Sequence, residues 1–430
     1  MSPLTAARAQ MEVSLGFHMV FAALGIGLPL LLVIAEAQWL RTGLPHYRAL
    51  ARQWAKATAL TFAVGAVSGT ALSFELGLLW PQFMAFSGAT IGSAFTLEGF
   101  AFFLEAIFLG LYLYGWERLS PRNHWLTGIP VALSGLASGV MVVAVNAWMQ
   151  YPFGPAGSGD LRLGPTAPFA SPAWLHMAVH SSLSCYIATG FAAAGIYAAG
   201  MLRGRRDAYH RSGLRISMAV AGVCALLQPL SGDVSARAVA RLQPAKLAAM
   251  EALFETRTGA PLTVGGWPDM DAQEVRFGIE IPKALSFLAH HDFNAEVAGL
   301  DQVPKQNWPN VVVTRTAFQI MVGIGFLLVA IALAHWWADR RRADLPGLLL
   351  RALVFAAPLG FIALEAGWVV TEVGRQPWVI YQVMRTSDAV TTVPGIATTF
   401  VGFTLLYAFL GVALTMLLRR LAQNRLAEYG

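Results

Sequence analysis

Eight ionisable side chains lie within, or at the ends of, long apolar runs of this sequence. Inside a bilayer a carboxylate or an imidazole costs roughly 2.5–3.5 kcal/mol on insertion scales, so each one needs a compensating group. For any single residue, a hydrogen bond to a neighbouring helix is the simpler explanation. Eight in one chain instead favour proton transfer or metal ligation. They are His18, Glu75, Glu98, Glu105, His176, His180, Glu365 and Glu372.

Two of these carboxylates are spaced for a relay. In LEGFAFFLEAIF, Glu98 and Glu105 are seven residues apart. Seven residues make two helical turns, so both carboxylates share one face, about 10 Å apart along the axis. This spacing favours a path for protons or cations. A pair of hydrogen bonds between helices is the simpler alternative.

Two histidines and a methionine could bind metal. His176 and His180 are four residues apart and can share a helix face. They could form a metal pair, one ligand and one bystander, or two hydrogen-bonded core histidines. Met321 alone is normally a packing residue. Paired with a histidine from another helix, however, it would complete the axial ligands of a low-spin haem.

The stretch TEVGRQPWVIYQV combines a carboxylate with a cation at the end of an apolar run. Trp368 lies one turn before Glu372, and Arg375 lies one turn after it. Pro377 ends the helix, and Trp378 fits the aromatic belt of a membrane interface. Arg375 can pair with Glu372 or with an acidic group of a ligand, such as a haem propionate. The stretch is therefore either a structural cap or a carboxylate ligand beside an anion-binding group.

Long apolar helices must hold these residues. With 56% hydrophobic residues, 13% charged residues and a mean hydropathy of +0.55, the chain of 430 residues is too apolar for a soluble domain. Runs of about 20 such residues span ~30 Å of hydrocarbon. We predict an all-α bundle, a single membrane domain over residues 1–430. Its nine predicted spans are 11–37, 59–80, 94–116, 125–149, 173–202, 216–232, 316–337, 348–373 and 393–418.

Basic residues set the orientation of these spans. More than half of the 30 Lys and Arg residues lie in the tail and in the loops after spans one, three, five and seven, most densely in RGRRDAYHRSGLR. Short segments on the other side carry only Arg8, Arg162, Arg375 and Arg385. Because short basic loops stay in the cytoplasm, we predict an outside N-terminus and a cytoplasmic C-terminus. Orientation explains the pI of about 9.5, and nucleic-acid binding is not expected.

The loop over residues 233–315 is the one sizeable segment predicted outside the membrane. QPAKLAAMEALFET has the apolar spacing of a short helix, which GAPLTVGGWPD ends. EIPKALSFLAHHDF is apolar enough to lie at the membrane surface. The two cysteines, Cys185 and Cys224, fall in apolar runs, so we interpret them as packing residues and predict no disulfide.

Taken together, these residues resemble subunit I of the cytochrome bd family of quinol oxidases over almost the whole chain. The family pattern WxxxExGRQPW is present from Trp368 to Trp378, and EGFAFFLE resembles the family's helix with two glutamates. NAWMQYP and the N-terminal RxQ also fit. KLAAME supplies the family's quinol-loop spacing. The matching residues outside the first two motifs are Arg8, Gln10, His18, Asn146–Pro152, Asp233, Lys246 and Glu251.

The resemblance assigns roles to individual residues. It implies that His180 and Met321 are the axial ligands of haem b558, and that His176 is a bystander. His18 and Glu372 match ligands of the two high-spin haems, b595 and d, with Glu98 beside them. Glu105 matches a proton-pathway position. Lys246 and Glu251 match quinol contacts, expected in a water-facing loop.

The resemblance also implies a reaction and partners. Quinol is expected to be oxidised at the outer face of the bacterial inner membrane, and dioxygen to be reduced to water with cytoplasmic protons. Subunit II and a small single-helix subunit are the expected partners in the bilayer.

The chain departs from the family pattern at three places. Gln319 stands where an arginine is expected two residues before Met321, so Arg315 is the candidate to compensate the haem propionates. SFELG, with Glu75, replaces the commoner EFQFG, and the loop lacks a long insertion. These features resemble a short-loop branch that includes cyanide-insensitive members, in which the third haem is either haem d or a haem b in its place.

Two other functions compete with this interpretation. A secondary transporter could use the glutamates of LEGFAFFLE for coupling ions, although the sequence has no clear inverted repeat. A membrane cytochrome b that does not reduce oxygen would leave His18 and Glu372 unexplained.

Overall fold

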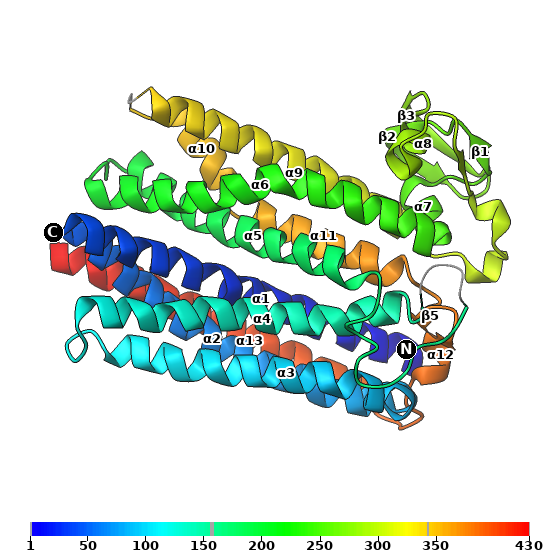
Figure 1. The fold of residues 1–430 in the computed structure, drawn as a ribbon, viewed down its shortest axis with the longest axis horizontal. Coiled ribbons are helices and arrows are strands. Elements are labelled where there is room, and N and C mark those ends of the chain that lie inside the picture. The colour runs from blue at the N-terminus through cyan, green and yellow to red at the C-terminus, as the bar shows by residue number, and fades with distance from the viewer. Residues whose placement is uncertain (1, 155–158, 342–343, 430) are drawn as a thin grey trace.

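The computed structural model describes residues 2–154, 159–341 and 344–429, and among these it has nine helical segments able to span a membrane. The predicted number is therefore confirmed. The bundle is shown in Figure 1. The segments are α1 (Pro3–Thr42), α2 (Pro45–Leu79), α3 (Pro81–Tyr114), α4 (Pro121–Gln150), α5 (Trp174–Leu202), α6 (Ala208–Leu242), α9 (Val311–Arg340), α10 (Gly347–Ala356) with α11 (Leu359–Val373), and α13 (Ile396–Tyr429).

Local sequence signals set the helix ends beyond the apolar runs. Helices α1 to α4 each begin with a proline. Proline is favourable there because the N–H that it lacks would have no partner within the helix at that position. The side chains of Ser2 and Asn310 cap the starts of α1 and α9. Because α6 continues to Leu242, Asp233 lies inside that helix, and Arg315 likewise lies inside α9. The connection that leaves the bundle is thus shorter than the predicted loop.

One predicted span is broken. The run 348–373 forms α10 and α11, which are separated at Ala357 and Pro358. Proline lacks the N–H that would continue the helical hydrogen bonds, so the chain starts a new helix after it. Residues of α11 line the cavity described below.

Helix α5 lies at the centre of the bundle and packs through small residues. A Cβ on Gly195 would lie 2.5 Å from the Cβ of Ala357, and one on Gly360 would lie 2.6 Å from the Cα of Ala188. Such contacts bring helices close enough for backbone packing in a membrane. They fix α5 against α10 and α11.

The connection between α6 and α9 folds as a small subdomain. Its first helix, α7 (Pro244–Glu251), confirms the predicted short helix. GAPLTVGGWPD, expected only to end that helix, forms strand β2 (Leu262–Asp269), which pairs antiparallel with β3 (Glu274–Ile281). The other elements are β1 (Arg257–Thr258), α8 (Ala284–His290), β4 (Glu296–Val297), η1 (Leu300–Gln302) and η2 (Lys305–Asn307).

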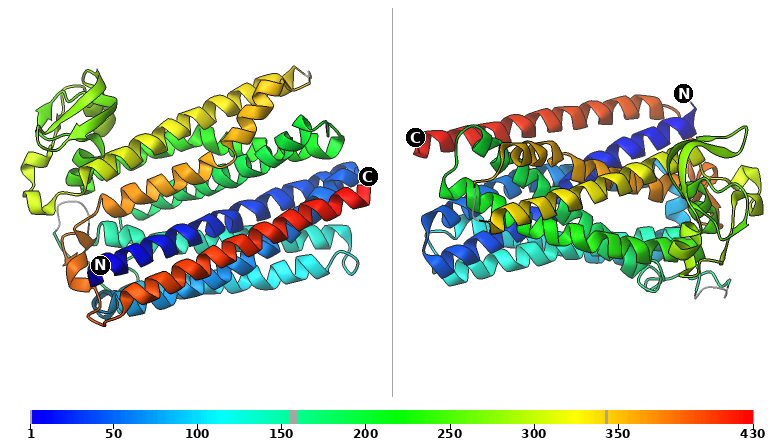
Figure 2. Two further views of the ribbon diagram at one scale, coloured as in Figure 1. Left: turned by 180° about the vertical axis from the view of Figure 1, so that it is seen from behind. Right: turned by 90° about the horizontal axis from the view of Figure 1, so that it is seen from above.

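The two termini lie at opposite ends of the bundle. The N-terminus, the α7–β3 subdomain and the connection after α11 lie at one end, here called the loop end, and the C-terminus lies at the other (Figures 1 and 2). The connection after α11 contains β5 (Trp378–Ile380), β6 (Met384–Arg385) and α12 (Thr386–Ala389).

Candidate functional site

A cavity of about 750 Å³ lies between α5, α6, α9, α11 and the loop subdomain. This volume falls in the usual range of small-molecule sites. Five residues predicted as site residues line it, and they come from four different elements. They are His180, Lys246, Glu251, Met321 and Trp368.

The imidazole and the thioether face this cavity from different helices. His180 Nε2 lies 3.2 Å from Gln228 Nε2, and His180 Nδ1 is buried without a hydrogen-bond partner among the described residues. Gly367 leaves room for Met321, because a Cβ there would lie 3.0 Å from the methionine sulfur. Histidine nitrogen and methionine sulfur are the donor set of a low-spin haem. The residues therefore fit that group.

His176 lines the same cavity one turn away. Its Nδ1 lies 3.1 Å from Ser235 Oγ on α6. This contact with a serine orients the imidazole ring without metal ligation, as expected of a bystander.

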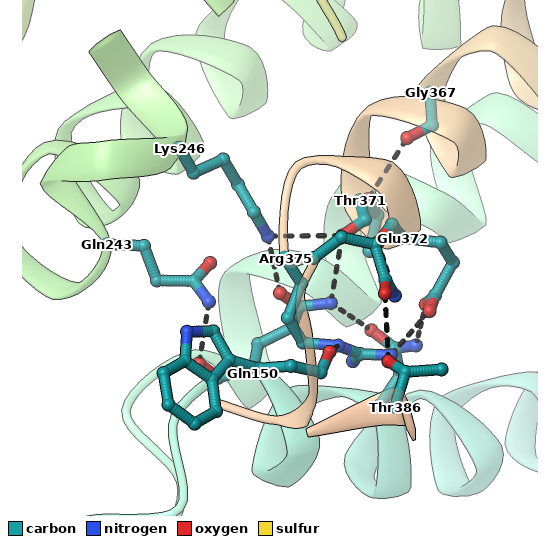
Figure 3. A network of polar contacts seen from close by, with 11 residues as sticks. Gln150, Gln243, Lys246, Gly367, Thr371, Glu372, Arg375 and Thr386 are labelled. Atoms are coloured by element: carbon teal, nitrogen blue, oxygen red, sulfur yellow. Dashed lines mark hydrogen bonds and ion pairs between the residues drawn. The ribbon is translucent and has the colours of Figure 1, made fainter. Parts of the chain in front are cut away.

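Lys246 joins α7 to α4 and α11 (Figure 3). Its ammonium donates to Gln150 Oε1 and, at 3.2 Å, to the carbonyl oxygen of Thr371. Gln243 donates to the backbone of Gln150 at 2.8 Å, which holds the start of α7 in place. Lys246 is only 4% exposed and Glu251 only 6%. The expectation that both lie in a water-facing loop was wrong, because α7 folds back onto the bundle.

Burial changes the acid–base properties of both loop residues. It raises the pKa of Glu251 to about 7, although Arg315 acts in the opposite direction. Burial and the charge of Arg375 lower the pKa of Lys246, while Glu372 opposes this effect. Glu251 Oε2 has no hydrogen-bond partner in the described part of the chain. A buried carboxyl with a pKa near neutrality can exchange protons at physiological pH.

Arg315, the candidate to compensate the haem propionates, is not among the residues that line the cavity. Its guanidinium donates to three backbone oxygens of the loop subdomain at 2.7–2.9 Å, those of Glu251, Thr263 and Gly265. Gln319, one turn further along α9, also contacts Thr263 and Gly265. These two residues fasten the loop to α9, so propionate compensation by Arg315 finds no support in the geometry.

Glu372 and Arg375 form a second cluster next to Lys246 (Figure 3). Asn146 Nδ2 donates to Glu372 Oε1 at 2.6 Å, and Arg375 Nη2 donates to Oε2 at 2.5 Å. Arg375 Nη1 is buried and has no hydrogen-bond partner within the described ranges. A carboxylate has about four lone-pair sites, so Glu372 retains capacity for a ligand, and Arg375 retains a donor for an anion. Glu372 therefore fits a ligand of a haem iron, and Arg375 fits a partner for an acidic side chain of that haem, its propionate.

His18 lies apart from the cavity, between α1 and α2. Its Nδ1 is 2.9 Å from Ser68 Oγ, and Gly69 leaves room for the ring, since a Cβ there would lie 2.9 Å from Cε1. Glu365 of α11 approaches the same part of α1. Its Oε2 would lie 3.4 Å from a Cβ on Gly16, and its Oε1 is buried and unpaired among the residues described. Sequence reasoning counted Glu365 but gave it no role.

The two glutamates of α3 share a face, as their spacing predicted. Ser138 of α4 donates to Glu98 at 3.3 Å. Glu105 is buried beside Gly135 of α4 and Gly25 of α1, with its carboxylate oxygens 3.3 Å and 3.9 Å from the positions that their Cβ atoms would take. Both carboxylates therefore point toward α4.

A further buried cluster was missed. Glu36 accepts a hydrogen bond from Tyr112 at 2.7 Å and lies 2.6 Å from His124 Nδ1, near the C-terminal end of the bundle. Glu36 is inside the first apolar run, so the criterion that found the other carboxylates could have found it too.

These features define a class. A helical membrane protein that brings an imidazole and a thioether from different helices into one cavity, beside a buried lysine and glutamate, has the construction of a haem-binding membrane oxidoreductase.

Comparison with known proteins identifies the family. Residues 6–426 match the family model for cytochrome bd terminal oxidase subunit I. The chain is 38% identical to a putative cytochrome bd menaquinol oxidase subunit I of Bacillus subtilis (strain 168), over 97% of this chain and 96% of that protein. It is 30% identical to the cytochrome bd-II ubiquinol oxidase subunit 1 of Escherichia coli (strain K12), over 89% and 88%.

A solved structure agrees. A chain of the bd oxidase from Geobacillus thermodenitrificans superposes with a TM-score of 0.91 at 38% identity, over 98% of each chain. The chain belongs to the cytochrome bd oxidase subunit I family. It is thus a multi-pass protein of the bacterial plasma membrane and the haem-containing subunit of a terminal quinol oxidase, which works with a subunit II. The comparisons give no support to the transporter alternative.

Proposed function

We propose that quinol is oxidised in the loop-end part of the cavity, against Lys246 and Glu251, and that His180 and Met321 hold a low-spin haem b558 in its deeper part. The observation that carries this proposal is that all four side chains line one cavity. When bound, this haem supplies a one-electron acceptor next to the quinol. No long electron path is then needed.

Glu251 has the chemistry to accept a quinol proton. A catalytic base works best when its pKa lies near the operating pH, and burial brings that of Glu251 to about 7. Lys246, held by Gln150 and Thr371, orients the other end of the site. Its contact with the segment before Glu372 joins the quinol site to the second cluster.

His18 and Glu372 are proposed to hold the two high-spin haems, b595 and either haem d or a third haem b. Glu98 lies beside them, and Trp368 packs against the low-spin site. Arg375 is proposed to bind a propionate, because its Nη1 is a buried donor without a hydrogen-bond partner among the described residues. Glu105 and Glu98 are proposed to carry protons from the cytoplasm.

The proposed orientation places the loop end outside and the C-terminus in the cytoplasm, on the strength of the basic loops. A small single-helix subunit is proposed as a further partner beside subunit II. The 233–315 segment is proposed as the quinol-binding part of a single membrane domain.

Spectra of the purified oxidase with subunit II test the haem assignment. We expect His180→Ala and Met321→Leu to remove the low-spin band of the reduced-minus-oxidised spectrum. Carbon monoxide binding should persist, because that gas needs an open iron position. His176→Ala is the matched control and should keep the low-spin band. Loss of that band in His176→Ala, or its survival in His180→Ala, would overturn the assignment.

A further inference from the structure

The hairpin of β2 and β3 has an apolar face that the other described residues leave largely uncovered. Phe277 is 95% exposed and Ile279 71%. Val264 lies opposite Ile279 in the strand register, and Leu262 lies opposite Ile281, so these four side chains share one face of the hairpin. Monomeric soluble surfaces seldom carry so many adjacent apolar groups, so this face points to a partner.

The backbone at Phe277 supports the same conclusion. Its φ of 60° lies in the left-handed region, which is a genuine outlier for a bulky aromatic residue. Such strain persists where surrounding structure or function compensates it. Within the described chain Phe277 gains little packing in return, because its side chain is almost fully exposed.

The position of the hairpin identifies what covers it. Figures 1 and 2 show the hairpin beside the loop end of α9, projecting outward from the bundle. Trp267 and Phe277 line a shallow depression together with Val312 of α9. Further along, α9 exposes Ile320 and Phe326, as a lipid-facing helix does. The apolar face is therefore continuous with the exposed apolar surface of a helix able to span a membrane.

The hairpin is also fixed to the cavity. Arg315 and Gln319 of α9 hold the backbone at Thr263 and Gly265, so the hairpin cannot move freely relative to that helix. Leu262 and Val264 of the hairpin line the cavity, as does Leu288 of α8. One face of this element is thus both an apolar outer surface and the rim of the quinol cavity.

We propose that the β2–β3 hairpin lies in the interfacial layer of the loop-end leaflet and forms a lipid-facing rim, under which long-tailed quinol enters the cavity sideways from the membrane. This inference rests on the proposed quinol site. Lipid is favoured over a protein partner because the apolar face continues the exposed apolar surface of α9, a helix long and apolar enough to span a membrane. Exposed aromatic side chains such as those of Trp267 and Phe277 are typical of the interfacial layer. Arg276 at the tip pairs with Asp269 at 2.7 Å, which suits contact with polar headgroups.

Depth-dependent quenching tests the membrane contact without any need for activity. The native cysteines, Cys185 and Cys224, are buried, so a fluorophore attached to Phe277→Cys reports on the hairpin. In nanodiscs of the complete oxidase, phosphatidylcholine brominated on its acyl chains should quench this probe. The same label on Lys305→Cys, in exposed η2, should not be quenched. Equal emission from the Phe277→Cys probe in brominated and ordinary lipid would overturn the proposal. The same result would follow if subunit II, and not lipid, covered this site.

Substrate length tests the route of entry. In proteoliposomes, Phe277→Asp with Ile279→Asp should raise the KM for long-tailed quinol several-fold and leave kcat and the haem spectra unchanged. A short-tailed, water-soluble quinol should keep its KM, because it reaches the site from water. Glu280→Gln, in the same strand between Ile279 and Ile281, is the matched control. An equal rise for both quinols would refute lateral entry. A wild-type oxidase with no quinol saturation would refute the proposed site itself, while the quenching result would still stand.

Discussion

The haem-ligand pair and the two glutamates of α3 were the parts of the site that the sequence predicted best. His180 and Met321 were paired through the family resemblance, and the structure brings both into one cavity. Glu98 and Glu105 share a face because two helical turns separate them, a relation that sequence alone fixes. The burial of Lys246 could not be predicted, since a charged residue in a polar segment gives no sign that its helix will fold onto α11.

That burial leads to a prediction about pH. The pKa of Glu251 is about 7, so its carboxylate is the main form above pH 7 and the neutral acid is the main form below. If Glu251 accepts the quinol proton, kcat/KM should rise with pH through about 7. Glu251→Gln should lose this rise, with a large defect at pH 8 and a small one at pH 5.5. The pH profile of quinol-dependent oxygen uptake measures both.

Glu255→Gln is the control for this profile. The Glu255 side chain is 75% exposed, and it pairs only weakly with Arg257, at 3.6 Å. It should keep the wild-type pH dependence. A Glu251→Gln oxidase with an unchanged alkaline rise would remove Glu251 from the role of base.

Glu372 gives a second prediction at this scale. If Glu372 is only a structural residue held by Asn146 and Arg375, its replacement by Gln should lower the free energy of unfolding by about 1.5–3 kcal/mol and change the activity little. If Glu372 is a haem ligand, the neutral amide of Gln is a poor substitute for its carboxylate. We expect Glu372→Gln to lose the carbon monoxide-binding signal and quinol-dependent oxygen reduction while the low-spin band persists. Asn146→Ala, which removes one hydrogen bond to the carboxylate, should show a milder form.

Full haem content and near-normal turnover in Glu372→Gln would instead identify the GRQPW segment as structural. The spectra of the purified complex and its oxygen consumption distinguish the two outcomes.

At the scale of elements, the apolar runs predicted the spans but not their ends. Helix α6 continues through Arg237, which pairs with Asp233 one turn earlier at 2.6 Å, and such a pair supports the helix in a polar stretch that the apolar run does not cover. The short strands were not foreseen. The pairing depends on contacts between β2 and β3 and on hydrogen bonds from Arg315. The spacing of apolar residues along the sequence predicts neither.

The contact between α7 and α11 depends on a glycine. A Cβ on Gly374 would lie 2.4 Å from the carbonyl oxygen of Val370 and 3.0 Å from Lys246 Cγ. We expect Gly374→Ala to push α7 away and to raise the KM for quinol several-fold. Gly110→Ala in α3, with nothing within 4 Å of the added atom, should leave the KM unchanged. Equal kinetics of the two variants would show that this contact does not position the quinol site.

At the scale of the whole molecule, the two ends of the bundle carry different chemistry. The loop end holds Lys246, Glu251 and the segment around Glu372, whereas the basic loops gather at the C-terminal end (Figure 1). Helix α3 runs from the loop end to the C-terminal end, so Glu105 lies nearer the C-terminal end than Glu98. Tyr114, the last residue of α3, is nine residues beyond Glu105, about 14 Å at 1.5 Å per residue.

This arrangement predicts which side each proton uses. In the proposed function, quinol protons leave at the loop end, and protons for water formation pass Glu105 from the C-terminal end. In proteoliposomes with the loop end outside, quinol oxidation should alkalinise the lumen, as measured with a trapped pH dye. Glu105→Gln should slow this alkalinisation and oxygen uptake together by at least about tenfold, the lower end of what general acid–base groups contribute. The KM for quinol and all haem spectra should remain as in the wild type, because Glu105 does not line the cavity and is not a proposed haem ligand. Unchanged proton uptake in Glu105→Gln would mean that protons reach the oxygen site by another route, and the shared face of α3 would then be a packing surface.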